Sequence, residues 1–310
     1  MCAIRCNVDI LIPSFNGRKL LGSVLTHLPD IIGSEHRITV VDDASTDDSV
    51  DFVSSKYPEV QLITRKINGG FAAAVNEGIR ATQGEYILLL NSDVELTAEI
   101  LDNIIPVFSD PNVFAVSPKI TIPQRGGIDE GCKTGFWHHG MFYADQRQGV
   151  TSQTPILYAT GCAAVYRRSM LEALGGFDEA YSPFYWEDAD LGYRAWKRGW
   201  KTIYQPESVA IHQHSSTIST LDRRFTDKIK SRNALLFIWR NIEDRDILAV
   251  HQKWLPLVIA KKAMQRDMSF VAGYKEARKM CIEALAARDN DSQQRTMTDR
   301  EIFEICEIAC

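Results

Sequence analysis

Three polar residues at the end of one apolar segment are the first candidates for chemistry. Asn91, Ser92 and Asp93 directly follow Tyr86–Leu90, a run short enough to be a fully buried strand of a parallel sheet. Such a strand would deliver Asp93 to the carboxyl edge of the sheet, where open α/β folds bind their ligands. A carboxylate there could hold a divalent cation against a diphosphate, because hard cations favour oxygen ligands. The alternative is that Asn91 and Asp93 only shape a turn and begin the next helix.

Three earlier apolar segments are also followed by polar loops. In a doubly wound sheet such loops lie side by side at one edge and can form a continuous pocket. Pro13 and Phe15 could flank a flat base, and Asp43 could accept a hydrogen bond from a base N–H or a ribose hydroxyl. For the second loop, the alternative is helix capping with favourable charge at a helix N-terminus. The loops are Pro13-Ser14-Phe15-Asn16-Gly17, Asp42-Asp43-Ala44-Ser45-Thr46-Asp47 and Asn68-Gly69-Gly70-Phe71.

The second and third loops carry features that capping does not explain. Asp42 and Asp43 are adjacent, although carboxylates that close raise each other's pKa. Gly69 and Gly70 precede a predicted helix, where they would let the backbone approach a phosphate closely. Neither a Gly-x-Gly-x-x-Gly fingerprint nor a Walker phosphate loop follows these segments. The dehydrogenase and P-loop NTPase interpretations therefore lose their usual support.

Two more candidates lie in the second half of the chain. Glu187, Asp188 and Asp190 fall in the first turn of a predicted helix, where each acid gains about 0.3–1 kcal/mol from the helix dipole. That structural explanation suffices for Glu187 and Asp190. His212 ends a short apolar segment, and His214 follows two residues later. A lone histidine is more often a structural residue than a ligand, so the residue types alone leave both interpretations open.

Alternating strand-like and helix-like segments would position these loops. From about residue 8 to residue 121, short apolar runs bounded by turn residues alternate with helical stretches. Such alternation implies right-handed crossovers and a parallel, doubly wound sheet in a Rossmann-like first half. The expected strands are 8–12, 38–41, 60–64 and 86–90, and the expected helices are 18–28, 47–57, 72–81 and 98–108.

The alternation breaks between residues 123 and 155, where glycines and aromatic residues interrupt it. A long insertion of this kind is often a binding loop rather than scaffold. Beyond residue 220 the chain is expected to be helical, with a frayed polar stretch at 288–295. The remaining expected elements are strands at 163–166 and 201–204 and helices at 169–174 and 186–198.

Composition excludes several classes of protein. The hydrophobic fraction of 45% is ordinary for a globular protein, and the net charge of -5 gives no support for nucleic-acid binding. Seven cysteines without Cys-x-x-Cys spacing argue against a disulfide framework or a structural zinc site. No run approaches the roughly 20 apolar residues of a spanning helix, and the N-terminus lacks the apolar core of a secretory signal. We therefore expect a cytoplasmic protein with one domain at 1–220 and a helical extension at 221–310.

Taken in order, these motifs resemble those of inverting glycosyltransferases of family two, and rhamnosyltransferase-like members in particular. The resemblance covers about residues 8–219 and implies an α/β, Rossmann-like fold of the A type with a mostly parallel central sheet. It makes 1–220 a nucleotide-sugar-binding domain whose acceptor side begins at about residue 123. The motifs are Ile12-Pro13-Ser14-Phe15-Asn16, Val41-Asp42-Asp43-Ala44-Ser45-Thr46-Asp47, Asn68-Gly69-Gly70-Phe71 with Asn76, Leu90-Asn91-Ser92-Asp93, Glu187-Asp188 with Asp190, and His212.

On the donor side, the resemblance implies that Pro13, Phe15 and Asp43 contact a uracil or thymine ring. Asp93, the last residue of the family's Asp-x-Asp motif, would bind Mg²⁺ or Mn²⁺ bridging the diphosphate, and His212 would complete this metal site. Asn91 replaces the first aspartate of the motif, as it does in rhamnosyltransferase-like proteins. The rest of the nucleotide-sugar site would comprise Ser14, Asn16, Asp42, Asn68, Gly69, Asn91 and Ser92.

On the acceptor side, the resemblance supplies a catalytic residue. Inversion at the anomeric carbon needs one base that deprotonates the acceptor hydroxyl, and the resemblance places it at Asp188. No separate acid is required, because a metal can neutralise the departing nucleoside diphosphate. Gly161 would line the acceptor side, and Trp186 and Glu187, which directly precede the base, would contact the substrate.

We therefore expect a metal-dependent inverting hexosyltransferase that moves a sugar from a nucleoside diphosphate sugar, dTDP-rhamnose or a UDP-hexose. The acceptor would be a hydroxyl of a glycan or a lipid-linked molecule in cell-envelope polysaccharide biosynthesis. One alternative is a nucleotidyltransferase, which shares the base-binding scaffold. Another is a catalytically silent sugar-nucleotide-binding module, and the Asn91 departure is its best support.

The helical tail has two interpretations. It could be an interfacial surface that touches the membrane and meets a lipid-linked acceptor, because Lys261 and Lys262 follow an apolar stretch. It could instead be a helical cap packed on the catalytic domain or the contact surface of a homo-oligomer, and this second interpretation is the favoured one.

Overall fold

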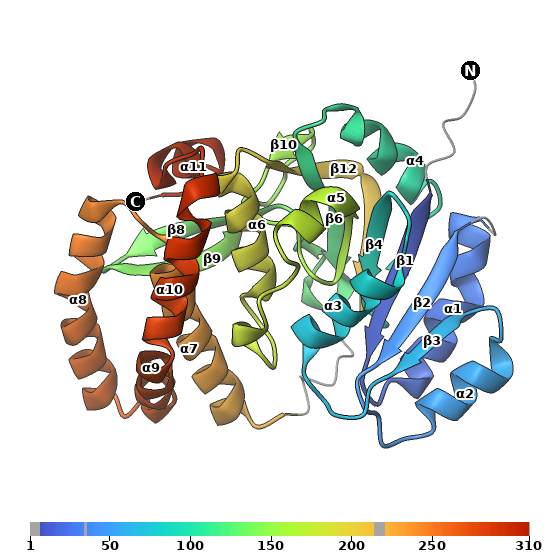
Figure 1. Ribbon diagram of the computed structural model, residues 1–310, viewed down its shortest axis with the longest axis horizontal. Helices are drawn as coiled ribbons and strands as arrows, with labels where there is room; N and C mark the ends of the chain where they lie inside the picture. Colours follow the sequence, from blue (N-terminus) through green and yellow to red (C-terminus); the bar gives the residue numbers. More distant parts are fainter. Residues whose placement is uncertain (1–6, 34–35, 214–220, 310) are drawn as a thin grey trace.

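The computed structural model describes residues 7–33, 36–213 and 221–309. Its centre is a ten-stranded sheet with the order β10-β12-β6-β11-β4-β1-β2-β3, while β5 pairs with β12 and β7 pairs with β6. Helices flank this sheet, and the last five helices gather at one side of the molecule (Figure 1). The sheet strands are β1 (Val8–Ser14), β2 (Arg37–Asp42), β3 (Gln61–Thr64), β4 (Tyr86–Leu90), β5 (Val94–Leu96), β6 (Val113–Ile122), β7 (Ile128–Asp129), β10 (Thr154–Pro155), β11 (Ala163–Arg167) and β12 (Lys201–His212).

Side chains that alternate along the central strands form a separate core on each face of the sheet. Ile10 and Leu88 pack with one set of helices, whereas Leu11 and Leu89 pack with the other. A strand buried on both faces must be apolar throughout, which is why β4 is a continuous apolar run. The flanking helices are α1 (Arg18–Ile32), α2 (Ser49–Lys56), α3 (Phe71–Ala81), α4 (Ile100–Ile104), α5 (Arg168–Ala173) and α6 (Glu187–Lys197), with 3-10 turns η1 (Ile105–Ser109), η2 (Pro123–Arg125) and η3 (Glu179–Tyr181).

The predicted, mostly parallel central sheet is confirmed, with one interruption. β4, β1, β2 and β3 are mutually parallel, and β12 is parallel to β6. β11 lies between β4 and β6 and is antiparallel to both, so the sheet is mostly rather than wholly parallel. Ala163 pairs with Leu90, and the chain preceding β11 therefore lies beside the carboxyl end of β4.

Strands make up about half of the segment 123–155, so the expectation of a loop was wrong for that half, while its expected role in binding stays a prediction. The segment contains β7 and the hairpin of β8 (Lys133–His138) and β9 (Met141–Gln146), which forms a sheet of its own. Burial does not alternate along either strand of the hairpin, so its sequence lacks the period-two signal of a strand. β12 also differs from expectation: it runs beyond 201–204 to His212, through an irregularity between Gln205 and Val209.

The C-terminal helices share one apolar core with the hairpin and α6. Phe142 of β9, Trp196 of α6 and Phe237 of α7 all belong to this core. The stretch 288–295 is not frayed, because α10 continues to Asp291 and Arg295 forms an ion pair with Glu243. Among the described residues, no helix is both long and apolar enough to cross a membrane. The helices are α7 (Arg223–Asn241), α8 (Arg245–Met264), α9 (Met268–Lys279), α10 (Cys281–Asp291), η5 (Ser292–Gln294) and α11 (Asp299–Ile305).

Asp190 joins α6 to the C-terminal helices. Its carboxylate is fully buried and accepts hydrogen bonds from Arg194 Nε at 2.6 Å, Asn241 Nδ2 at 2.8 Å and Tyr181 Oη at 3.1 Å. Burial opposes its ionisation, but the Arg194 and Arg240 charges and the Asn241 hydrogen bond outweigh burial and lower the pKa of Asp190 below 3.8. The carboxylate therefore holds the start of α6 against α7.

Replacing Asp190 by Ala should lower the free energy of unfolding by about 3–5 kcal/mol, because the Arg194 charge would remain buried without its partner. Urea denaturation at neutral pH measures this change. Asp51→Ala on the exposed side of α2 is the control and should change stability by no more than about 0.5 kcal/mol. Because the pKa of Asp190 is lower in the folded state, its contribution is present above pH 3.8 and is lost as pH falls further. Equal stability of the two variants would contradict this role.

Candidate active site

The first and second loops are tied together at the carboxyl edge of the sheet. Asn16 Oδ1 accepts hydrogen bonds from the backbone N–H of Thr46 at 2.7 Å and of Asp47 at 3.3 Å. In return, the Asn16 N–H donates to Ser45 Oγ at 2.8 Å. Asn16 takes a positive φ of 51°, which asparagine tolerates better than most residues. Asn16, which was predicted to contact the nucleotide sugar, therefore holds the first and second loops together.

Asp43 fixes the third loop. Its buried carboxylate accepts hydrogen bonds from the N–H groups of Gly69 at 3.0 Å and Gly70 at 2.8 Å, and Arg65 Nη1 lies 2.5 Å away. Gly70 has a φ of +84°, and a Cβ there would lie 2.7 Å from the Pro183 carbonyl oxygen. Arg65 was not singled out in the sequence, because a lone arginine after a strand carries no motif.

The other predicted donor residues lie around these loops. Asp42 Oδ2 accepts a hydrogen bond from the Ser45 N–H at 2.9 Å, while its buried Oδ1 and the neighbouring Ser14 Oγ have no partner among the described residues. Pro13 and Phe15 are half-buried, and Asn68 is exposed. The structure thus provides two polar atoms beneath the loops that a bound ligand or water could satisfy.

Backbone pairing brings Asp93 and His212 together. β5 follows the Asn91-Ser92-Asp93 turn and pairs antiparallel with the end of β12, so that Val94 lies opposite His212. As a result, His212 Nε2 lies 3.5 Å from Asp93 Oδ2, a buried oxygen that has no other partner among the described residues. His214, the possible substitute for His212, lies outside the described residues.

Two further residues join this pair that the sequence did not assign to it. Glu130 Oε2 lies 3.1 Å from His212 Nδ1, and a Cys162 sulfur, a Glu130 oxygen and a His212 nitrogen all lie within 4.8 Å of one another. Burial disfavours charge on His212, but hydrogen bonds from its ring to Asp93, Cys162 and Glu130 outweigh burial and raise its pKa to about 12. Glu130 escaped notice because it lies in the aperiodic segment 123–155.

The donor atoms in this cluster fit a divalent cation. Asp93 and Glu130 offer carboxylate oxygens, which suit Mg²⁺ and Mn²⁺, and His212 offers a nitrogen, which favours transition metals over Mg²⁺. A cation that displaces the ring proton would also satisfy Asp93 Oδ2, which His212 Nε2 approaches only to 3.5 Å. Asp93 and His212 Nε2 could therefore hold a metal, and Glu130, which faces Nδ1, would orient the ring.

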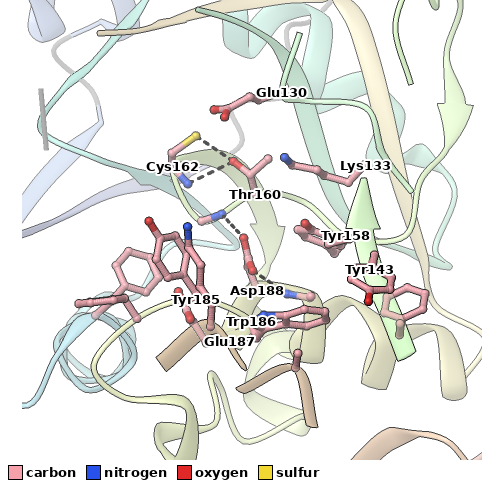
Figure 2. A pocket seen from close by; sticks show the side chains of 18 of the residues that line it. Glu130, Lys133, Tyr143, Tyr158, Thr160, Cys162, Tyr185, Trp186, Glu187 and Asp188 are labelled. Atoms are coloured by element: carbon pink, nitrogen blue, oxygen red, sulfur yellow. Dashed lines mark hydrogen bonds between the residues drawn. The ribbon is translucent and has the colours of Figure 1, made fainter. Parts of the chain in front are cut away.

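One cavity of about 630 Å³ joins this cluster to the start of α6. Figure 2 shows Asp188 and Trp186 on one side of it and Glu130 and Lys133 on the other. Pro13, Phe15 and Asp43 do not line it, because the donor loops lie farther along the sheet edge. Its lining includes the predicted residues Asn91, Gly161, Trp186, Glu187, Asp188 and His212, together with Glu130, Lys133 and Cys162.

The Asp188 carboxylate projects into this cavity with few partners. Among the described residues, it accepts hydrogen bonds from two backbone groups only. These are the N–H of Gly161 at 3.2 Å and the N–H of Ala189 at 2.8 Å. Burial raises the pKa of Asp188 above 3.8, although the Gly161 hydrogen bond and the Lys133 charge oppose the rise. Burial and the Asp188 charge likewise raise the pKa of Glu187 well above 4.5. A carboxylate with a raised pKa is a stronger base, which suits proton abstraction.

The backbone that leads into α6 is strained. Tyr185 and Trp186 take positive φ angles of 70° and 78°, each of which costs on the order of 1–3 kcal/mol for such residues. Asn233 Nδ2 compensates by donating hydrogen bonds to the Phe184 and Tyr185 carbonyl oxygens. The Trp186 ring packs 5.2 Å from that of Phe237 and also lines the cavity. The strain turns α6 so that its first residues face the cavity.

Gly161 is small for a steric reason as well as an electrostatic one. A Cβ at this position would lie 2.9 Å from the Phe71 ring, so a larger residue would displace the backbone N–H that binds Asp188. The Asn91 N–H donates to the Cys162 carbonyl oxygen at 2.8 Å, which holds this loop against the end of β4. The loop that contains Gly161 and the turn that begins at Asn91 are therefore held at a fixed separation.

Comparison with known proteins identifies the family. The model of glycosyl transferase family 2 matches residues 9–175, more than half of the chain, and the chain therefore belongs to this family. The chain is 28% identical over 214 residues to the pre-mycofactocin glycosyltransferase of Mycobacterium tuberculosis, which covers 68% of this chain and 44% of that protein. It is 29% identical over 204 residues to the N-acetylglucosaminyl-diphospho-decaprenol L-rhamnosyltransferase of the same species, with coverages of 56% and 66%. The chain spans about half to two thirds of the length of these curated relatives.

Solved structures confirm the fold. The chain superposes on GalNAc-T7 with UDP, GalNAc and Mn²⁺ at a TM-score of 0.70 and 16% identity, covering 97% of this chain and 56% of that one. At this identity the likeness shows the fold alone, which is the A-type glycosyltransferase fold. The expected recognition of a family two glycosyltransferase and the expected fold class are both confirmed.

Replacing Asp43 by Ala should loosen the third loop, because the Gly69 and Gly70 amides lose their acceptor. We expect hydrogen exchange at these two amides to accelerate at least tenfold, about the factor that corresponds to one lost hydrogen bond. Exchange monitored by mass spectrometry or NMR measures this effect. Glu77→Gln is the matched control, since Glu77 Oε2 binds the same Arg65 at 2.8 Å but contacts neither glycine N–H. Equal exchange in both variants would show that Arg65, not Asp43, orders the loop.

Proposed function

We propose that this chain transfers a sugar from a nucleoside diphosphate sugar to an acceptor hydroxyl with inversion. The observation that carries the proposal is the shared cavity, which has Asp188 on one side and His212, beside Asp93, on the other. A carboxylate with a raised pKa therefore faces a cluster suited to a cation across a space large enough for a sugar. Membership of glycosyl transferase family 2 supports the same reaction.

Asp188 would act as the base. The acceptor hydroxyl oxygen bonds to the anomeric carbon, its proton passes to an Asp188 oxygen, and the bond from that carbon to the diphosphate oxygen breaks. Attack from the face opposite the leaving group inverts the carbon. The N–H groups of Gly161 and Ala189 hold the carboxylate in position, and the Lys133 charge lowers its pKa against the effect of burial. Trp186 would lie against the sugar, and Glu187 would keep Asp188 basic.

Asp93 and His212 would hold a divalent cation, Mn²⁺ or Mg²⁺, and Glu130 would orient the imidazole from its other ring nitrogen. When bound, it would neutralise the charge that develops on the departing nucleoside diphosphate. The imidazole favours Mn²⁺ over Mg²⁺, because Mg²⁺ prefers oxygen ligands alone. The presence of Mn²⁺ and UDP in the GalNAc-T7 structure supports a cation at this place in the fold. Asn91, which lines the cavity, would contact the donor as a neutral replacement for the usual aspartate.

The donor loops would hold the nucleotide, with Pro13 and Phe15 beside the base. We propose dTDP-rhamnose or a UDP-hexose as donor, and the rhamnosyltransferase of Mycobacterium tuberculosis supports the first. The acceptor would be a glycan or a lipid-linked molecule, as the decaprenol in the name of that relative suggests. It would enter past the hairpin of β8 and β9 and the C-terminal helices, because Tyr143, Lys230 and Phe270 line that side of the cavity.

Replacing Asp188 by Asn should reduce sugar transfer by about 10²–10⁴-fold and leave donor binding nearly unchanged, because the amide cannot accept the proton. Release of nucleoside diphosphate from a panel of nucleotide sugars measures turnover, and calorimetry measures donor binding. In the wild type, kcat/KM should fall as pH decreases through the raised pKa of Asp188, where the base becomes protonated. Retained turnover in the variant would remove Asp188 from this role, and pyrophosphate release from a nucleoside triphosphate would indicate a nucleotidyltransferase.

Replacing Asp93 or His212 by Ala should weaken Mn²⁺ binding by roughly tenfold or more, since each change removes one ligand. The signal of free Mn²⁺ in electron paramagnetic resonance measures this without turnover. Glu130→Gln should weaken binding less than either alanine variant, because Glu130 faces the ring nitrogen that Asp93 does not. Glu95→Gln, on the exposed side of β5, is the nearby control and should not weaken it. Identical Mn²⁺ titrations for all four variants and the wild type would contradict the proposed cation site.

A further inference from the structure

An apolar stripe is exposed along the outer face of α8. Val250, Leu257 and Met264 recur every seven residues, so they lie along the same side of the helix, and they are 49%, 56% and 79% exposed. Met268, at the start of α9 just beyond the turn, is 62% exposed. Single exposed apolar residues are common, but three on one side of a helix, followed by the exposed Met268, indicate an interaction surface.

This stripe is not needed to hold α8 in place. The opposite side of the helix supplies the packing residues, including Leu248, Leu255 and Ile259, which lie against the core shared with the hairpin. His251 Nδ1 lies 2.6 Å from the Gly140 carbonyl oxygen, and Trp254 stacks on His139 at 4.4 Å. Smaller polar residues at the outward positions would therefore leave these packing contacts of α8 unchanged.

Positive charge accompanies the stripe. Lys253 and Lys261 are exposed on the same side of α8, and Arg266 is exposed in the turn that follows. Every residue from 250 to 268 is described, and none of the exposed ones is acidic. The single acid of this segment, Asp267, is half-buried and binds Lys262 Nζ at 2.9 Å. A local excess of positive charge on a chain whose net charge is -5 indicates a negatively charged partner.

The surface lies next to the open side of the candidate active site. In Figure 1, the turn between α8 and α9 is at the lower edge of the molecule, the edge toward which β1 runs. Lys262 and Phe270, on either side of this turn, line the cavity that contains Asp188. A partner bound to the outer face of α8 would therefore lie beside the acceptor entrance.

We propose that this surface, the α8 face, binds the surface of an anionic lipid bilayer. A row of apolar side chains flanked by lysine and arginine matches the boundary between acyl chains and anionic headgroups, where both kinds of side chain are satisfied. A protein partner would match the apolar side chains, but the cations of the segment 250–268, which has no exposed acid, favour a uniformly negative surface. The exposed Asp246, one turn before Val250, marks the end of this face. The proposal extends the proposed function, because it would bring a lipid-linked acceptor to the cavity. The α8 face consists of Val250, Lys253, Leu257, Lys261, Met264 and Arg266.

Sedimentation of the full chain with lipid vesicles tests this. The chain should bind vesicles of equal parts phosphatidylcholine and phosphatidylglycerol at least roughly tenfold more tightly than phosphatidylcholine alone, and added salt should weaken the binding. The double variant Lys261→Glu with Arg266→Glu should bind roughly tenfold more weakly or worse, since each cation near such a membrane contributes about fivefold. The double variant Arg37→Glu with Arg80→Glu makes the same change in net charge at exposed sites on other elements and should bind like the wild type.

The apolar part of the α8 face has its own test and control. Leu257→Glu with Met264→Glu should weaken vesicle binding, whereas Ile282→Glu should not, because Ile282 is 80% exposed on α10, outside the α8 face. Equal binding to both lipid mixtures, or equal loss in the control variants, would overturn the proposal. The proposal would also be overturned if the wild type formed a dimer and the double variant Leu257→Glu with Met264→Glu were a monomer. A second copy of the chain, and not a membrane, would then cover this face. Donor binding measured without vesicles should be unchanged in all variants, which separates failure here from failure of the proposed reaction.

Discussion

The antiparallel pairing of β11 with β4 determines where a site can form. Because Ala163 lies opposite Leu90, the loop that contains Gly161 and Cys162 lies against the polar residues that follow β4. The pairing of β5 with β12 then fixes His212 beside Asp93. Backbone ladders, and not attraction between the side chains themselves, bring these groups together. The hydrogen bonds of each ladder set the register of the paired strands, and the register decides which groups lie opposite one another.

This constraint gathers several ionisable groups in a small, partly buried volume, and the structure compensates for each charge differently. The ring of His212 lies between the carboxylates of Asp93 and Glu130, and these contacts outweigh the cost of burying its charge. Asp190 is neutralised by Arg194 and serves the fold. Asp188, two residues earlier, receives only backbone hydrogen bonds among the described residues, so its pKa rises instead. Carboxylates on the same turn thus divide into one whose pKa is lowered and one whose pKa is raised, because of their neighbours.

The acceptor side of the cavity is built by the parts of the chain that carry the fewest motifs. The hairpin of β8 and β9 and the helices α7 to α9 enclose it with aromatic and basic residues, and they share one core with α6. Because α6 packs in that core, the position of Asp188 depends on the same helices that enclose the cavity. The loops at the carboxyl ends of β1, β2 and β4 are instead held by the sheet.

The sequence by itself determined the elements of the first half and the loops that end them, because hydrophobic periodicity and turn residues are local signals. The strands 8–12 and 86–90 and the helix 72–81 were predicted close to their observed bounds. Only the tertiary structure decided that β11 runs antiparallel, that about half of 123–155 folds as strands, and that Glu130 and Cys162 join His212. Likewise, the ion pair of Arg65 with Asp43 and the exposed stripe of α8 appear only when distant segments are placed. These features depend on contacts between residues far apart in the chain, and no local pattern of residue types specifies which distant partner a side chain will meet.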